Sequence, residues 1–144
     1  MKNLLLAATA ALLLAHAAHA QKIAATQVPA AAQATFKARF PAVKTIAWEK
    51  EGAAYEAAFR LNGKTMSAVI TAAGAWQETE TAMRLGELPA AVRATLARDY
   101  RAYTVTEAAT IVKADGRTVY EAEVAKGGQK QDVLFTAAGK VLAD

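Results

Sequence analysis

A stretch of twenty residues occurs twice in this chain of 144 residues, and the duplication restricts the fold more than any other feature. The first copy runs from Tyr55 to Gly74 and the second from Tyr120 to Gly139, at a constant offset of 65 without a gap. Eight of the twenty paired positions are identical, including the opening Tyr-Glu-Ala and the closing Thr-Ala-Ala-Gly. A unit of about 60 residues buries only roughly 60% of its unfolded surface, so we expect the two units to pack together.

The pattern within each copy predicts β-hairpins. Residues 55–61 alternate between apolar and polar side chains, as a half-buried strand does. Asn62-Gly63 follows directly, and this pair is a strong hairpin signal because a type I′ turn needs positive φ at both central positions. Further strands are predicted at 43–51, 64–71 and 75–79, and similar strands follow in the second half around Asp115-Gly116 and Gly127-Gly128.

A short helix is predicted before each copy. Val28-Pro29 and Leu88-Pro89 open these helices at an offset of 60, and proline suits the first turn because its missing N–H would be unpaired there. Phe36 and Phe40 recur at helical spacing, so we expect them to be buried against one face of a sheet. The sequence therefore predicts an α+β fold with two tandem repeats at 28–80 and 88–144, joined by a connector at 81–87. Each repeat is predicted as one helix packed on a four-stranded antiparallel β-meander, with the two sheets side by side.

Residues 1–20 have the pattern of a secretory signal peptide. Lys2 precedes an apolar run from Leu4 to Leu14, and Ala18-His19-Ala20 is a small-x-small cleavage site. Ala15-His16-Ala17 fits the same rule, so cleavage after position 17 or position 20 is predicted. The apolar run is shorter than the about 20 residues that a transmembrane helix needs. We therefore expect a periplasmic protein with no membrane span after cleavage, and a mobile lead at 21–27.

The remaining chain lacks the side chains that most catalysis requires. It has no cysteine, and both histidines fall within residues 1–20. Ser67 is the one serine, without a histidine or cysteine to act with it, so no catalytic residue and no enzymatic activity are predicted. The glycine pairs are hairpin turns and not phosphate-binding loops, so no cofactor is predicted. Charges are interspersed and aromatic residues are not interleaved with them, which argues against nucleic acid.

The acidic residues leave two interpretations open. Glu121 and Glu123 are spaced i, i+2, so on a strand both carboxylates share one face. Such a pair suits a hard cation such as calcium, but solvated strand faces show the same spacing, and no metal site is predicted. If the tyrosines point inward, Glu56 and Arg60 lie on the open face with these two glutamates. Trp48 and Trp76 are either core residues or partner contacts, because tryptophan is enriched at interaction hot spots.

These motifs together resemble the PepSY-like, beta-lactamase-inhibitor-like family of exported bacterial domains. The matching positions are Val28-Pro29, Tyr55-Glu56, Asn62-Gly63 and Gly74 in the first copy, and Leu88-Pro89, Tyr120-Glu121, Gly127-Gly128 and Gly139 in the second. The resemblance implies tandem α+β repeats whose sheets form one curved surface. The beta-lactamase inhibitors grip an enzyme with such a surface and carry disulfides inside their repeats, whereas this chain has no cysteine.

The resemblance implies a periplasmic, non-enzymatic binding or inhibitor-like module. Such a module would hold an envelope protein or peptide on its exposed sheet face. The residues predicted to contact the partner are Glu56, Arg60, Trp76, Glu121 and Glu123. The alternative is an envelope protein that responds to a cation or another small ligand through carboxylates such as Glu121 and Glu123.

Overall fold

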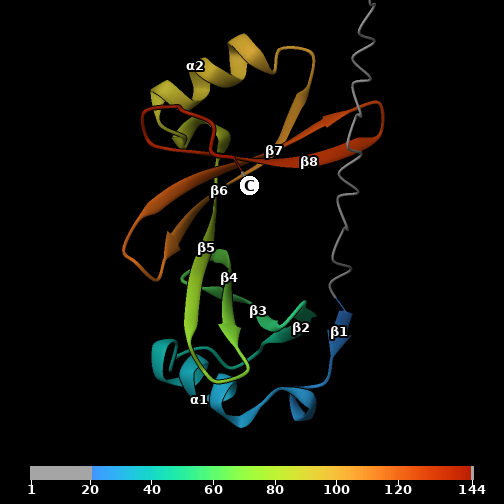
Figure 1. Cartoon of the computed structure of the whole chain (residues 1–144), viewed down its shortest axis with the longest axis vertical. Helices are drawn as coiled ribbons and strands as arrows, with labels where there is room; N and C mark the ends of the chain where they lie inside the picture. Colours follow the sequence, from blue (N-terminus) through green and yellow to red (C-terminus); the bar gives the residue numbers. More distant parts are fainter. Residues whose placement is uncertain (1–20, 144) are drawn as a thin grey trace, which may run out of the picture.

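The computed structural model describes residues 21–143, which form eight β-strands, two α-helices and two short 3-10 helices (Figure 1). The predicted signal peptide therefore lies outside the described residues. The elements of the first half are β1 (Gln21–Ile23), η1 (Ala25–Gln27), α1 (Ala30–Arg39), β2 (Ala47–Glu51), β3 (Ala54–Leu61), β4 (Lys64–Thr71) and β5 (Trp76–Met83). Those of the second half are η2 (Leu85–Glu87), α2 (Ala90–Asp99), β6 (Thr104–Lys113), β7 (Thr118–Lys126) and β8 (Gln129–Phe135).

All eight strands belong to one antiparallel sheet in which the spatial order follows the chain, β1 to β8. The prediction of two four-stranded sheets side by side is therefore wrong, although each helix does pack on antiparallel strands. The reason lies in β5, which extends to Met83 and so includes part of the predicted connector. It pairs with β4 along one edge and with β6 along the other. The offset between the repeats grows from 60 at the Pro residues to 65 at the Tyr-Glu-Ala motif, so the second repeat has five additional residues in between. They lengthen β6 to ten residues, against five in β2, and β6 pairs with β5.

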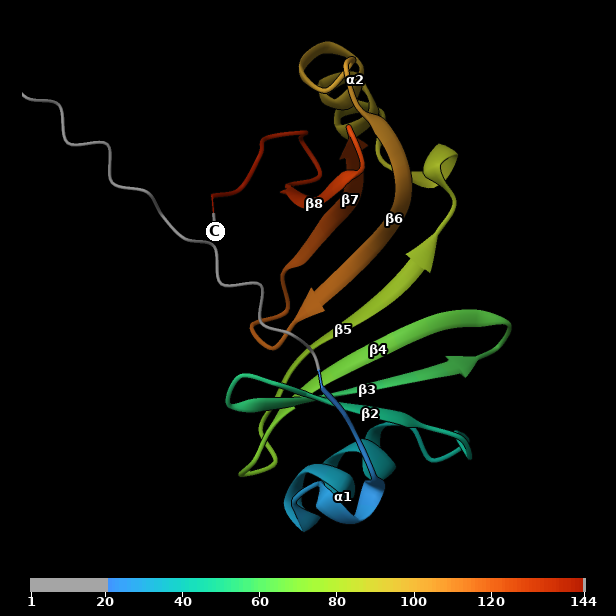
Figure 2. The same cartoon turned by 90° about the vertical axis from the view of Figure 1, so that its right-hand side faces the viewer.

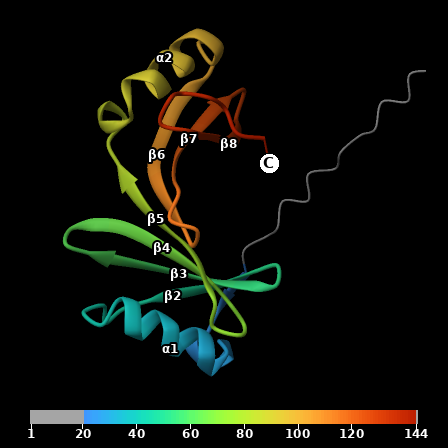
Figure 3. The same ribbon diagram turned by 60° about the vertical axis from the view of Figure 1, so that its left-hand side comes forward.

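The sheet bends sharply at β5 and divides the molecule into two lobes (Figure 2). We call β1–β4 with α1 the first lobe, and β6–β8 with α2 the second lobe. The helices lie at opposite ends of the molecule, each on the outer side of its lobe (Figure 3). The sheet surfaces that carry no helix therefore face each other across the bend, and we call this surface the open face.

The core of the first lobe is an aromatic cluster between α1 and the sheet. Phe36 of α1 is 2% exposed, and its ring centroid lies 5.1 Å from that of Phe59 and 5.6 Å from that of Trp48. Phe40 joins the cluster at 4.7 Å from Phe59. This confirms that Phe36 is buried, whereas Phe40, the residue after the end of α1, is half-buried at the margin of the cluster. Trp48 is a core residue.

The second lobe repeats this arrangement with aliphatic side chains. Val92 and Leu96 of α2 are buried against Ala122 and Val124 of β7 and Phe135 of β8. The helix ends at Asp99, so Tyr100 and Tyr103 lie beyond it and pack on the margin of this core.

The repeated Thr-Ala-Ala-Gly motif is a turn that docks on the helix of its own repeat. The hydroxyl of Thr35 on α1 donates a 2.7 Å hydrogen bond to the carbonyl oxygen of Gly74, and Thr95 on α2 does the same at 2.8 Å to Gly139. Both glycines have positive φ, and a Cβ atom on Gly139 would lie 2.4 Å from the carbonyl oxygen of Ala91. Glycine thus lets the turn and the helix backbone approach closely.

Residues 21–27 are not the mobile lead that the sequence predicts. Gln21–Ile23 form β1, which pairs with β2 opposite Trp48 to Lys50, and residues 25–27 form the turn η1. Gln-Lys-Ile is too short to show a strand pattern, and the pairing with β2 supplies the backbone hydrogen bonds. Within residues 21–143 there is no helix long and apolar enough to cross a membrane.

Candidate interaction face

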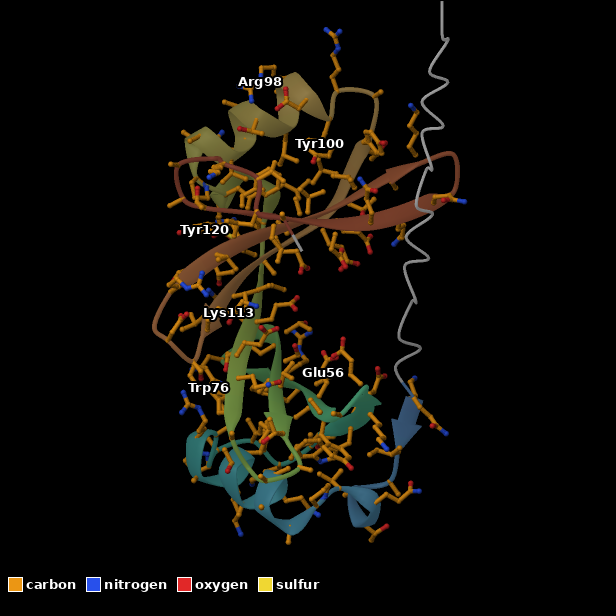
Figure 4. All side chains as sticks on the ribbon, in the orientation of Figure 1. Glu56, Trp76, Arg98, Tyr100, Lys113 and Tyr120 are labelled. Carbon is orange, nitrogen blue, oxygen red and sulfur yellow. The ribbon has the colours of Figure 1, made fainter. Side chains whose placement is uncertain are left out.

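Most of the acidic residues of the chain lie on the open face. Cross-strand partners share a face of a sheet, so the register identifies the members of this surface. Glu56 pairs with Val69, which pairs with Glu78, and Glu80 pairs with Ile111. Nine of the 13 acidic residues belong to the open face: Glu49, Glu51, Glu56, Glu78, Glu80, Glu107, Glu121, Glu123 and Asp132. Figure 4 shows Glu56 pointing from the first lobe toward the second.

Few basic side chains balance these carboxylates. Lys113 of β6 forms an ion pair with Glu78 of β5. Lys130 of β8 forms one with Glu123 of β7, with 2.7 Å between Nζ and Oε1. Among the described residues, Glu56, Glu80 and Glu121 have no ion pair, although they lie near the bend. The centre of the open face therefore has three carboxyl groups without a basic partner.

Apolar side chains on the same face show that the bend excludes water. Ala109 and Ile111 of β6 are each 3% exposed, and Val119 of β7 is 5% exposed. Their register places them with Glu80 and Glu121, away from the core under α2. No helix covers this side of the sheet, so the two lobes bury these residues by closing toward each other. The glutamates beside them lose part of their hydration as well.

This partial burial changes the acidity of the central carboxyl groups. Desolvation, and then repulsion from Glu56, raises the pKa of Glu80 to about 7. Desolvation, and then repulsion from Glu80, raises the pKa of Glu121 to about 8. The pKa of Glu56 is also raised, chiefly by desolvation. In contrast, hydrogen bonds from Lys130 and Thr106 lower the pKa of Glu123.

The structure brings four of the five predicted contact residues onto the open face. Glu56, Glu121 and Glu123 lie there as expected, and Arg60 lies at its edge. The Arg60 guanidinium donates hydrogen bonds to the carbonyl oxygen of Gly63 at 2.9 Å and to the Thr65 hydroxyl at 3.1 Å, so the β3–β4 turn holds it in place.

Trp76 lies on the other side of the sheet, apart from the four other predicted residues. A β-bulge between Val69 and Ile70 pairs Trp76 with the buried Ile70, while Glu78 pairs with Val69 on the open face. The bulge thus breaks the alternation that would place Trp76 and Glu78 on one face. The indole packs against the first core under the Arg39 guanidinium, whose Cζ lies 3.6 Å from the ring centroid.

Sequence reasoning missed the acidic residues contributed by β5 and β8. Glu78 and Glu80 have the i, i+2 spacing of strand residues, but they stood at the end of the predicted first repeat. Their place between Glu56 and Glu121 follows from the pairing of β5 with both neighbours. Asp132 comes to this surface through its pairing with Glu123.

Comparison with known proteins agrees with the repeat architecture. The sequence profile of the PepSY-like, beta-lactamase-inhibitor-like family matches residues 15–69 and again residues 54–143. The chain belongs to this family. The two matches overlap in the hairpin of β3 and β4, consistent with a duplicated unit. No curated protein matches the chain.

Several solved structures share the PepSY-like fold. A periplasmic protein from Bacteroides eggerthii has 28% sequence identity and a TM-score of 0.71, over 81% of this chain and 86% of that one. A BLIP-like protein from Bacteroides fragilis has 26% identity and a TM-score of 0.64, over 80% and 84%. A DUF2874 family protein from Bacteroides uniformis, at 24% identity and a TM-score of 0.70 over 80% and 86%, shows the fold alone.

We expect this PepSY-like protein to lose stability as the pH rises from about 4.5 to about 8. The pKa values of Glu80 and Glu121 rise from their usual 4.5 to about 7 and about 8 on folding. In that range the unfolded chain has released protons that the folded state retains, so each increase in pH favours unfolding. Both groups remain partly solvated, which limits the loss to roughly 1–3 kcal/mol. Thermal unfolding should show a Tm about 5 °C or more lower at pH 8.5 than at pH 5.

The variant Glu80→Gln with Glu121→Gln provides the decisive comparison. Because neither amide titrates, most of the Tm difference between the two pH values should disappear. The matched control is Glu87→Gln with Asp115→Asn, which removes two acids whose pKa values are lowered and which lie outside the open face. If the Tm of both variants depended equally on pH, Glu80 and Glu121 would not be the groups that cause the loss of stability.

Proposed function

We propose that this protein is a periplasmic, non-enzymatic binding module that holds a basic segment of an envelope protein or peptide on its open face. The observation that carries the proposal is the separation of charge. The whole chain has a formal net charge of +4, yet nine of its 13 acidic residues lie on this one surface. Complementary potentials steer association and select partners, so a cationic segment is the ligand that this surface favours.

The shape of the surface supports a polypeptide ligand. The open face runs across both lobes, so it is long enough for an extended segment to lie along it (Figure 2). The similarity to a periplasmic protein and to a BLIP-like protein supports both the location and the mode of binding.

The described residues offer no feature that favours the alternative of a cation-responsive protein. Within residues 21–143 there is no group of three or more His, Cys, Asp or Glu side chains placed to hold a metal ion. A basic peptide needs no such convergence, because its charges are spread along an extended chain. We therefore retain the binding module as the proposed function.

Site-specific photo-crosslinking in the periplasm of the source bacterium tests this proposal. A photoreactive amino acid would replace Ala58 in the first lobe or Ala125 in the second, since both lie on the open face and are only half-buried. We expect both positions to form adducts with the same partner through a basic segment. Replacing Glu56 and Glu121 with glutamine should reduce the adduct yield on the order of tenfold, because a bound cationic segment favours the ionised form of both carboxyl groups and glutamine cannot supply that charge.

A photoreactive residue at Arg98, on the outer side of α2, is the matched control. Adducts formed equally well from position 98, or adducts from the open face that are insensitive to the two glutamine substitutions, would overturn the proposal.

A further inference from the structure

A second candidate site lies on the outer side of the second lobe, away from the open face. A groove of about 330 Å³ runs between η2, α2 and the beginning of β6. This volume falls within the range of small-molecule sites, about 300–1,000 Å³. Its apolar lining consists of Leu85, Leu88, Leu96, Tyr100, Tyr103 and Val105. Leu85 stays 41% exposed at the rim, so the groove presents apolar surface to water.

Two arginines, Arg93 and Arg101, are the charged residues of this groove, and no acidic side chain within the described residues lines it. The remaining arginines of the second half each bind a carboxylate, in the pairs Arg84–Glu87, Arg98–Asp99 and Arg117–Asp115. Within residues 21–143, Arg93 and Arg101 have no such partner. Positive charge is thus left uncompensated beside an apolar groove.

The first repeat shows that folding does not require this charge. Gln33 occupies the position equivalent to Arg93, and its side-chain amide donates to the carbonyl oxygens of Val28 and Ala25, both at 2.9 Å. In the second repeat Arg93 Nε donates to the equivalent carbonyl oxygen, that of Leu88, at 3.1 Å. A neutral glutamine can therefore donate the hydrogen bond that the carbonyl oxygen of this turn accepts. Arg93 donates the equivalent bond through Nε alone, which leaves its terminal nitrogens available for a ligand.

We propose that this groove binds a long-chain carboxylate, with the acyl chain on the apolar lining and the carboxylate at the arginines that line it, Arg93 and Arg101. Guanidinium groups bind carboxylates through two parallel hydrogen bonds, so the chemistry of the two arginines favours this head group. The acyl chain would cover Leu85 and the two tyrosines, removing apolar surface from water. The site is separate from the open face, so either function can fail without the other.

Titration of the mature protein with dodecanoate below its micelle concentration, followed by two-dimensional NMR of the backbone amides, tests the site. We expect saturable shifts confined to residues 85–105. The double variant Arg93→Gln with Arg101→Gln should weaken binding at least tenfold, and the first repeat shows that glutamine at the former position is compatible with the fold. Thermal unfolding of the variant confirms that it is folded.

Two comparisons decide the outcome. Arg98→Gln removes the same charge from the same helix at a position paired with Asp99, and we expect affinity within twofold of wild type. Dodecanol, which has the chain without the charge, should bind at least tenfold more weakly than dodecanoate. Equal binding of the alcohol, equal losses in the Arg98 and groove variants, shifts spread over both lobes, or no saturation would each overturn the proposal. Shifts induced only by an acidic apolar peptide would reassign the groove to a protein partner and overturn it as well.

Discussion

Replacement of Phe36 with alanine is expected to lower the free energy of unfolding by about 3–5 kcal/mol. The side chain is 2% exposed and contacts the rings of Phe40, Trp48 and Phe59, so its removal leaves a cavity between α1 and the sheet. Domains of this size have a total stability of about 5–15 kcal/mol, and the variant should therefore be close to unfolding at room temperature. Urea denaturation followed by circular dichroism measures the loss directly.

Phe36→Leu is the control for this substitution. Leucine restores most of the lost volume, so its cost should be clearly smaller than that of alanine. A Tm for Phe36→Ala within two degrees of wild type would show that this residue does not anchor the first lobe.

Gly139→Ala is expected to have an effect of similar size, through steric conflict and not through a cavity. The new Cβ would lie 2.4 Å from the carbonyl oxygen and 2.6 Å from the carbonyl carbon of Ala91. Both are backbone atoms of α2, so the helix must move away from the turn. The φ of +79° adds about 1–2 kcal/mol of strain for a residue with a side chain. We expect a total loss of about 3 kcal/mol or more, measured by chemical denaturation.

Gly128→Ala separates these two contributions. Gly128 has a φ of +78°, nearly that of Gly139, but no atom lies within 4 Å of the Cβ it would gain. Its substitution should cost only the conformational strain of about 1–2 kcal/mol. If the two variants were equally stable, close packing of the turn against α2 would not explain the repeated glycine.

The fold of each repeat was largely predictable because its signals are local. Helical spacing placed Phe36 in the core, and Asn62-Gly63 and Gly127-Gly128 marked hairpins that the structure contains. The joining of the sheets was not predictable in this way, because it depends on pairing between β5 and β6, which are separated by a helix. β1 was missed for the same reason, since three residues acquire strand structure from pairing with β2.

The candidate site shows the same division between local and long-range information. Alternation assigned Glu56, Glu121 and Glu123 to the open face. Trp76 was predicted as a partner contact only because tryptophan is enriched at interaction hot spots. One extra residue in β5 reverses the phase of the strand and places Trp76 on the core side. Burial of Glu80 and Glu121 was equally inaccessible from sequence, because it arises from the bend that brings the two lobes together. The retained identity of Thr-Ala-Ala-Gly now has a steric explanation, in the docking of each turn on its helix.

The sharing of β5 between the lobes has a consequence for any attempt to divide the protein. A cut after Met83 would leave β6 as an edge strand with unpaired backbone groups, and Ala109 and Ile111 would lose the lobe that shields them. An exposed apolar edge of this kind promotes association between copies. The second unit is therefore dependent on the first, despite carrying its own helix and core. The duplication has therefore produced two halves with similar sequences, of which the second requires the first for its stability.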